Sequence, residues 1–133
     1  TAREHAIRIA LKDAHITADQ IDLISASANG SILNDHYEAR ALGRCFDLEK
    51  IPVMAVKSAL GDTLGASGAV QVVTLIESIK QDLIPGIYPL EEVDTVYSSL
   101  IKNNRNRTAE IQYALANAVS ADGNCCALIV KKP

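Results

Sequence analysis

Between Val53 and Ala69 the chain passes from a short β-branched segment into a glycine-containing turn and then into a run of small residues. This order is typical of a strand-to-helix connection in an α/β protein, because β-branched residues favour strands and small residues let a helix pack closely. The turn carries a charged pair, Lys57 and Asp62. Ligands of α/β sheets bind where strands end. We therefore predict an α/β fold with a candidate site at this connection.

The rest of the chain alternates between helical and extended patterns. Periodic apolar residues predict helices over 2–14, from Asn34 or Asp35 to about Phe46, and over 66–81, and apolar runs predict strands over 21–28, 52–56, 111–119 and 125–131. The stretch 83–89 is expected to be extended and 90–107 to be a polar loop. Asp122-Gly123 suits a tight turn between the last two strands. This order predicts one mixed sheet of four to five strands packed with helices and a C-terminal antiparallel hairpin.

Two finer expectations concern the second helix and the cysteines. Tyr37, Ala41, Leu42 and Cys45 are spaced to form the inward stripe of that helix. The adjacent pair Cys125-Cys126 lies in the last strand, where small buried residues are favoured over reactive thiols.

Composition limits the classes of function. The chain has 133 residues, of which 48% are hydrophobic, so it can build one core and is too short for two ordinary domains. Its net charge of −3, with dispersed basic residues, argues against a nucleic-acid partner. No apolar run approaches the roughly 18 residues of a membrane span. Three cysteines without a CxxC spacing favour neither disulfides nor zinc, so we expect a cytoplasmic protein with no metal and no cofactor.

Several motifs stand in the order found in one enzyme family. The segment from Lys57 to Gly68 matches Lys-Ser-x-x-Gly-His-x-x-Gly-Ala-x-Gly, and 32–38 matches Pro-Leu-Asn-Asp-x-x-Glu. Further matches are Asn-x-Ala-Arg at 104–107 and the hairpin motif Ala-Leu-Ser-Asn-Ser-Phe-Gly-Phe-Gly-Gly at 114–123. The chain therefore resembles the C-terminal half of a β-ketoacyl-ACP synthase, a condensing enzyme of the thiolase-like fold.

The resemblance implies a domain organisation. Residues 1–133 would form a C-terminal β-ketoacyl-synthase-like half-domain, a piece of a longer chain whose absent N-terminal half carries the Cys nucleophile. A family half-domain begins with a further strand before the first helix. We therefore expect an exposed sheet edge here that pairs with a partner, because an open edge is a ready template for another strand.

The chain departs from the family where the family does its chemistry. Condensing enzymes pair the Cys with two His, whose imidazoles polarise the thioester carbonyl and assist malonyl decarboxylation. Ser27 and Asp62 stand at these His positions, and Lys57 alone survives of the catalytic set. A carboxylate is a poor donor to a developing enolate and repels malonate. The resemblance thus implies a candidate catalytic set of Lys57, Ser27 and Asp62. We expect that a protein with this set does not catalyse ordinary decarboxylative condensation.

The same resemblance implies a substrate pocket and partners. The pocket residues would be Asn29, Ser31, Asn117, Val119, Ser120, Asp122 and Gly123. The partners would be an acyl carrier protein or acyl thioester, the N-terminal half, and a second synthase subunit in a homo- or heterodimer. A basic cluster, Lys102, Arg105 and Arg107, is either a solvated loop or a docking site for an acidic carrier.

Two functions remain open. The first is a non-condensing homologue that pairs with an active synthase, as a chain-length factor does. The second is an active acyltransferase of altered mechanism, with Lys57, Asp62 or Ser27 in new roles. The sequence gives equal weight to Lys57 as a functional cation and as a structural ion pair with Asp62.

Overall fold

The computed structural model describes residues 1–88, 90–98, 100–101 and 105–133. Its elements are α1 (Ala2–Asp13), η1 (Ala18–Gln20), β1 (Leu23–Ser25), α2 (Ile32–Cys45), β2 (Val53–Met54), α3 (Lys57–Leu60), η2 (Leu64–Ala66), α4 (Ser67–Gln81), β3 (Leu83–Ile84), η3 (Thr95–Tyr97), β4 (Arg107–Thr108), β5 (Tyr113–Val119) and β6 (Cys125–Lys131). The predicted α/β class is confirmed. Two residues of the sequence analysis, Lys102 and Asn104, lie outside the described ranges.

One mixed sheet positions everything else. Its strand order is β2-β1-β5-β6. Strand β1 runs parallel to both β2 and β5, while β5 and β6 form the predicted antiparallel hairpin. The hairpin turn closes with Ser120 N donating to Asn124 O at 3.0 Å. Because β1, β2 and β5 are parallel, their carboxyl ends meet at one edge, where ligands of α/β sheets usually bind.

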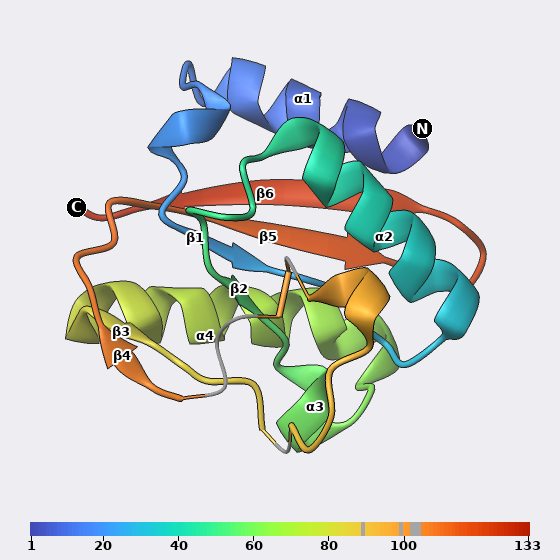
Figure 1. Cartoon of the computed structure of the whole chain (residues 1–133). Coiled ribbons are helices and arrows are strands. Elements are labelled where there is room, and N and C mark those ends of the chain that lie inside the picture. Colours follow the sequence, from blue (N-terminus) through green and yellow to red (C-terminus); the bar gives the residue numbers. More distant parts are fainter. Residues whose placement is uncertain (89, 99, 102–104) are drawn as a thin grey trace.

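Helices cover both faces of this sheet (Figure 1). On one face, α1 and α2 bury Ile7 and Leu42 against the Leu115 side of the sheet. On the other face, α4 buries Leu75 and Ile79. Strands buried on both faces read as continuous apolar runs rather than as alternating patterns, and this explains why the sequence signal for β1 was so plain.

The last strand has its predicted bounds, the other three predicted strands are shorter than expected, and a second sheet was missed. The predicted strand 21–28 pairs only over Leu23–Ser25, and 52–56 only over Val53–Met54. A separate antiparallel pair joins β3 to β4, with Leu83 opposite Thr108. The prediction of an extended segment and a polar loop did not include this pairing, because two-residue strands leave no periodic pattern to read.

The second helix corrects two details of the sequence analysis. Ser31, rather than Asn34 or Asp35, is its N-cap, and its side-chain oxygen accepts from the Asn34 N–H at 3.4 Å. The buried stripe contains Glu38, Ala41 and Leu42, whereas Tyr37 is 44% exposed. The helical repeat therefore turns a carboxylate inward where an aromatic ring was expected.

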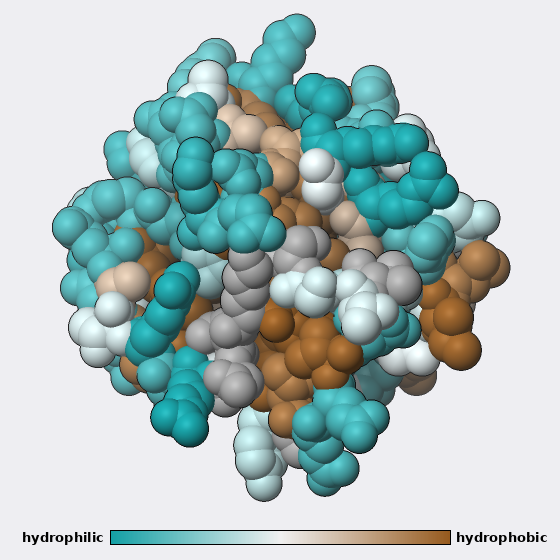
Figure 2. Space-filling model, viewed as in Figure 1, coloured by the Kyte–Doolittle hydropathy of each residue, from teal (hydrophilic) through white to brown (hydrophobic). Residues whose placement is uncertain are grey.

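Strand β6 forms an edge of the described sheet. Half-buried and exposed positions alternate from Cys125 to Leu128, and Leu128 is 44% exposed. On the face seen in Figure 2, hydrophilic residues predominate in the upper part, over α1, and an apolar area lies in the lower middle, near α3 and the segment that carries η3.

Candidate functional site

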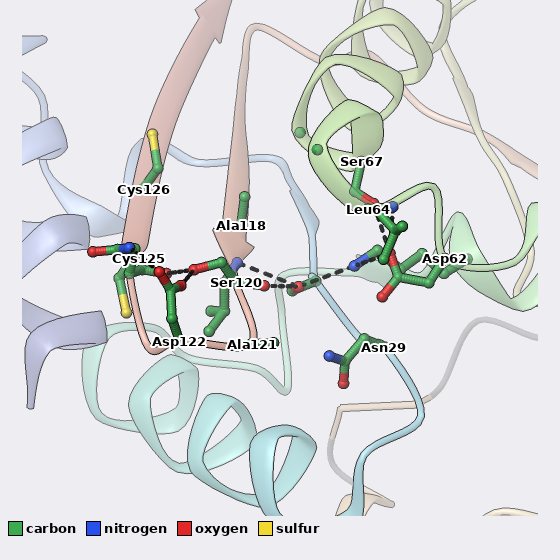
Figure 3. A pocket seen from close by; sticks show the side chains of 16 residues that line it. Asn29, Asp62, Leu64, Ser67, Ala118, Ser120, Ala121, Asp122, Cys125 and Cys126 are labelled. Atoms are coloured by element: carbon green, nitrogen blue, oxygen red, sulfur yellow. Dashed lines mark hydrogen bonds and ion pairs between the residues drawn. The ribbon is translucent and has the colours of Figure 1, made fainter.

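A cavity of about 580 Å³ opens where the parallel strands end. The end of β5, the hairpin turn, the segment after β1, and the connection from α3 to α4 surround it. Figure 3 shows Asp62, Leu64 and Ser67 on the α4 side of the cavity, and Ser120, Asp122, Cys125 and Cys126 on the hairpin side. The sequence analysis placed the candidate site at this strand-to-helix connection.

Ser27 lies two residues beyond β1 and is 3% exposed. Its hydroxyl donates to the carbonyl of Val119 at 3.4 Å. The same oxygen accepts from the Val119 N–H at 3.3 Å and from Lys57 Nζ at 3.4 Å. A hydroxyl has one proton and two lone pairs, so all of its hydrogen-bonding capacity is in use. Ser27 therefore ties the ends of two strands together.

Lys57 begins α3 and reaches into the cavity. Its side chain is 9% exposed, and its Nζ lies 3.5 Å from Asp62 Oδ1. The carboxylate of Asp62 is more open, with a side-chain exposure of 38%. The sequence left open whether Lys57 is a functional cation or the partner of Asp62 in an ion pair. The structure contains the ion pair with Asp62, and Lys57 also lines the cavity.

Asp62 accepts two hydrogen bonds from the start of the next helical segments, η2 and α4. Its Oδ1 accepts from the Ser67 hydroxyl at 2.8 Å and from the Leu64 N–H at 3.0 Å. The hydrogen bond from Ser67, followed by that from the Leu64 backbone, holds the pKa of Asp62 below its ordinary value. A carboxylate stabilised in this way is a weak general base. We refer to Lys57, Asp62 and Ser67 as the helix wall of the cavity.

A buried carboxylate that the sequence analysis did not assign lies behind Ser27. Glu38 accepts from the backbone N–H groups of Ser27 at 2.8 Å and Ala28 at 2.9 Å, and from the side-chain amide of Asn117. Desolvation by burial raises the pKa of Glu38 above its ordinary value. We refer to Ser27, Glu38 and Asn117 as the strand floor. The signal for Glu38 was present, since it is the Glu of the motif at 32–38.

Gln71 of α4 reinforces the strand floor from the opposite face of the sheet. It is 1% exposed, and its Nε2 lies within hydrogen-bond distance of the carbonyls of Ser25 at 3.0 Å, Ala26 at 2.9 Å and Asn117 at 3.1 Å. The two N–H groups of this amide are therefore placed to donate to carbonyls at the ends of β1 and β5.

The expected pocket residues divide into two groups. Asn29, Val119, Ser120 and Asp122 line the cavity. The others lie outside its lining: Ser31 caps α2, Asn117 is fully buried, and Gly123 adopts φ +89° in the hairpin turn. The turn itself is held by a hydrogen bond from the Ser120 hydroxyl to Asp122.

The cysteines correct another expectation. Cys126 is exposed and Cys125 is half-buried, and both line the cavity rather than lying buried in the sheet. The hairpin carries them beyond the cover of α1, so the apolar strand pattern did not predict burial here. Cys125 Sγ donates to the Gly123 carbonyl at 3.3 Å.

Within the described ranges, no group of three or more His, Cys, Asp or Glu is placed to hold a metal ion. Nor does any helix there have both the length and the apolar character to cross a membrane.

The comparisons with known proteins agree with the motifs. A family model, the C-terminal domain of β-ketoacyl synthase, matches residues 1–91. The 3-oxoacyl-[acyl-carrier-protein] synthase 2 of Mycobacterium leprae is 29% identical over 93% of this chain and 30% of its own length. The chloroplastic 3-oxoacyl-[acyl-carrier-protein] synthase II of Arabidopsis thaliana is 31% identical over 92% of this chain and 23% of its own length.

Solved structures share the fold. A β-ketoacyl synthase from Burkholderia phymatum superposes with a TM-score of 0.92 at 28% identity, covering 98% of this chain and 32% of its own. The ishigamide ketosynthase/chain length factor superposes with a TM-score of 0.88 at 30% identity, covering 96% of this chain and 32% of its own. The chain thus spans less than a third of the length of either curated relative.

Proposed function

The chain belongs to the β-ketoacyl synthase family, whose C-terminal domain it matches, and on that premise we propose that it is a non-condensing partner domain in fatty acid or polyketide biosynthesis. In this proposal, residues 1–133 act as the C-terminal half-domain of a synthase-like protein. The nucleophilic thiol for condensation comes from an N-terminal half or from an active partner subunit. The domain shapes the complex as a chain-length factor does, without polarising a thioester carbonyl itself.

The main support for this proposal is the hydrogen bonding of Ser27 and Asp62, the residues at the two positions where the family has imidazoles. The hydroxyl of Ser27 is fully used between Val119 and Lys57. Asp62 is an acceptor for the Leu64 N–H and the Ser67 hydroxyl. Neither position offers a hydrogen-bond donor to a developing enolate, and loss of one positioned donor typically lowers a rate by ~10²–10³.

The charges around the cavity point the same way. One cation, Lys57, and two carboxylates, Asp62 and Asp122, line the cavity. Two carboxylates against one ammonium disfavour a malonyl group, which carries its own negative charge. A neutral acyl thioester meets no such repulsion, so we propose an acyl thioester on a carrier protein as the ligand.

One similar structure favours the non-condensing assignment, because it bears the name of a ketosynthase/chain length factor. We propose that this chain pairs with a synthase subunit in the cytoplasm, in a homo- or heterodimer.

The test is an assay of malonyl-carrier decarboxylation by the full parent polypeptide, alone and with an active synthase. The proposal expects no turnover above background from the parent alone and activity in the mixture. Robust decarboxylation by the parent alone would refute it.

A second function is favoured by one observation, the position of Lys57. This ammonium lies on the cavity, 3.4 Å from Ser27 Oγ, with little exposure. In an acyltransferase of altered mechanism, it would supply the positive charge that stabilises a thioester oxyanion.

Lys57→Ala tests this alternative. It would abolish turnover and leave the fold intact, whereas Lys50→Ala, which removes an exposed ammonium paired with Asp47, would leave turnover unchanged. Equal turnover in both variants would exclude the alternative.

A further inference from the structure

The segment that follows β1 contains Asn29-Gly30, the one Asn-Gly pair in the sequence. Asn29 lines the cavity, where its side chain is labelled in Figure 3, and Gly30 is exposed. Asparagine is a thermolabile residue, because its side-chain amide can be lost to the backbone nitrogen that follows it. Glycine at the next position has no Cβ to crowd that nitrogen. This pair is therefore the place to look for a chemical change in the cavity lining.

One contact prepares the amide of Asn29 for attack. Its Oδ1 accepts from the Ser31 N–H at 3.1 Å. A hydrogen bond from an Asn side chain to the backbone two residues on forms a local turn, which folds the side chain back over the intervening peptide. The donated N–H also polarises the Cγ carbonyl, as a donor to a developing oxyanion does. The Cγ of Asn29 is thereby activated next to the Gly30 nitrogen.

A second contact opposes the attack. Asp35, in the first turn of α2, accepts from the Asn29 N–H through Oδ1 and from the Gly30 N–H through Oδ2, both at 3.1 Å. The Gly30 nitrogen must give up its proton to become a nucleophile. A carboxylate that accepts from this N–H favours the protonated nitrogen and disfavours the anion. The carboxylate of Asp35 therefore restrains the nitrogen that the neighbouring turn prepares to react.

We propose that Asn29 is a modification site at which the side-chain amide is lost, and that Asp35 is the positioning residue that keeps this loss slow in the folded protein. The Gly30 nitrogen loses its proton to water and bonds to Cγ of Asn29. The bond from Cγ to Nδ2 breaks, and the nitrogen takes up a proton and leaves as ammonia. One water molecule then opens the five-membered imide to aspartate or isoaspartate. Water is the only reactant consumed.

The modification changes the charge of the cavity. Its lining contains one cation, Lys57, and two carboxylates, Asp62 and Asp122. Loss of the Asn29 amide adds a third carboxylate, on the residue whose own N–H is bonded to Asp35. Like charges at this distance repel, so the modified segment is held less tightly to α2. The inference does not rest on the proposed function, because the modification is measured without any thioester.

Peptide mapping by mass spectrometry tests the proposal in the full parent polypeptide, incubated at mildly alkaline pH and sampled over time. In the natural chain, loss of the Asn29 amide should be at least about 10-fold slower in the folded protein than in urea, the effect on a rate of one hydrogen bond to a charged acceptor. Asp35→Ala should raise the rate in the folded protein by a similar factor. The matched control is Asp47→Ala, which removes another carboxylate that accepts a backbone N–H and should leave the rate unchanged.

Two further measurements separate a local effect from loss of structure. In urea the natural chain and Asp35→Ala should react at the same rate, because the native hydrogen bonds are absent there. In the folded proteins, loss of the amide of Asn124, an exposed residue of the hairpin, should be the same with and without Asp35. General destabilisation would speed both sites, whereas release of the Gly30 N–H speeds only Asn29.

Three outcomes would overturn the proposal. The first is loss of the Asn29 amide at equal rates in the folded natural chain and in urea, a comparison that holds even if Asp35→Ala does not fold. The second is an Asn29 amide that persists in urea as well. The third is a folded Asp35→Ala variant that reacts no faster than Asp47→Ala.

Discussion

The strand floor and the helix wall meet at one cavity but are built differently. The floor is a set of buried hydrogen bonds, in which Glu38 is 4% exposed and accepts from the backbone N–H groups of Ser27 and Ala28. The wall contains an ion pair whose carboxylate is 38% exposed and faces the cavity. A buried network costs much to disturb, whereas a half-exposed pair is screened by water. The difference assigns shape to the floor and adaptable chemistry to the wall.

The contrast also separates the two positions where the family resemblance places imidazoles. Ser27 belongs to the floor and Asp62 to the wall. Each has taken up a structural role, but with neighbours of opposite character. Substitutions in the floor should therefore cost more stability than substitutions in the wall.

The largest effect is expected from Glu38→Ala. The change leaves the N–H groups of Ser27 and Ala28 and the amide of Asn117 without their acceptor. Because each buried unsatisfied group costs ~1–3 kcal/mol, the free energy of unfolding should fall by at least about 3 kcal/mol. Urea denaturation measures this loss, and Glu91→Ala, at an exposed carboxylate, is the control. A loss below about 1 kcal/mol would mean that the hydrogen bonds of Glu38 do not hold the floor together.

The pH dependence of stability tests the same carboxylate. Burial raises the pKa of Glu38 above its ordinary value of 4.5. The folded protein then holds a proton that the unfolded chain has released, so this contribution is fully present below 4.5 and is lost as pH rises through the folded pKa. Glu38→Gln removes the effect, and its unfolding free energy should fall less steeply toward neutral pH than that of the natural chain. Parallel curves for the two proteins would contradict the assignment.

A smaller loss is expected from Ser27→Ala. The Val119 N–H loses its acceptor, and the tie between the ends of β1 and β5 is cut. The free energy of unfolding should fall by about 1 kcal/mol, the net value of one such bond. Ser58→Ala, which removes an exposed hydroxyl from α3, should cost less. Equal losses would show that Ser27 does not belong to the floor.

A small gain is expected from Ala28→Gly. Ala28 adopts φ +37°, a left-handed conformation that penalises a Cβ. Glycine removes that penalty but adds unfolded-state freedom, so the net stabilisation should be roughly 0.5 kcal/mol. Ala39→Gly, inside α2, should destabilise instead. Thermal unfolding distinguishes the two signs, and a destabilised Ala28→Gly would contradict the strain argument.

The smallest effect is expected from Asp62→Asn in the helix wall. The amide oxygen can still accept from Ser67 and Leu64, so the melting temperature should fall less than for Ser27→Ala. Hydrogen bonds hold the pKa of Asp62 below 3.8, so the charged form stabilises the fold above that value and the benefit is lost as pH falls through the folded pKa. The melting temperatures of Asp62→Asn and the natural chain should therefore converge in acid. Melting temperatures that move apart in acid would contradict the hydrogen bonding of Asp62 in the helix wall.

The sequence predicted the fold where its signals were long. Helix α4 was identified over 66–81 despite its β-branched residues, because its length exceeded that of any strand. The hairpin followed from Asp122-Gly123. The pairing of β3 with β4 was not predictable, because it joins two-residue segments distant in the chain.

The sequence predicted the residues that line the candidate site but not the buried residues behind them. Motif order located Lys57, Ser27 and Asp62 around one cavity. The role of Glu38 depends on the helical repeat that turns it under β1, and that of Gln71 depends on the spacing of two strands from α4. The local sequence pattern does not show which strand residues Glu38 and Gln71 will contact. These contacts can be identified only from the three-dimensional structure.

The most direct test of the structural role of both positions is the rate of condensation in the complex of the parent polypeptide with an active synthase. The rate should be compared between the natural chain and the double variant Ser27→Ala/Asp62→Asn, with unfolding measured alongside. We predict an unchanged rate with a reduced free energy of unfolding. A rate that falls by ~10² or more while stability is retained would contradict this conclusion and show that these side chains act on the substrate.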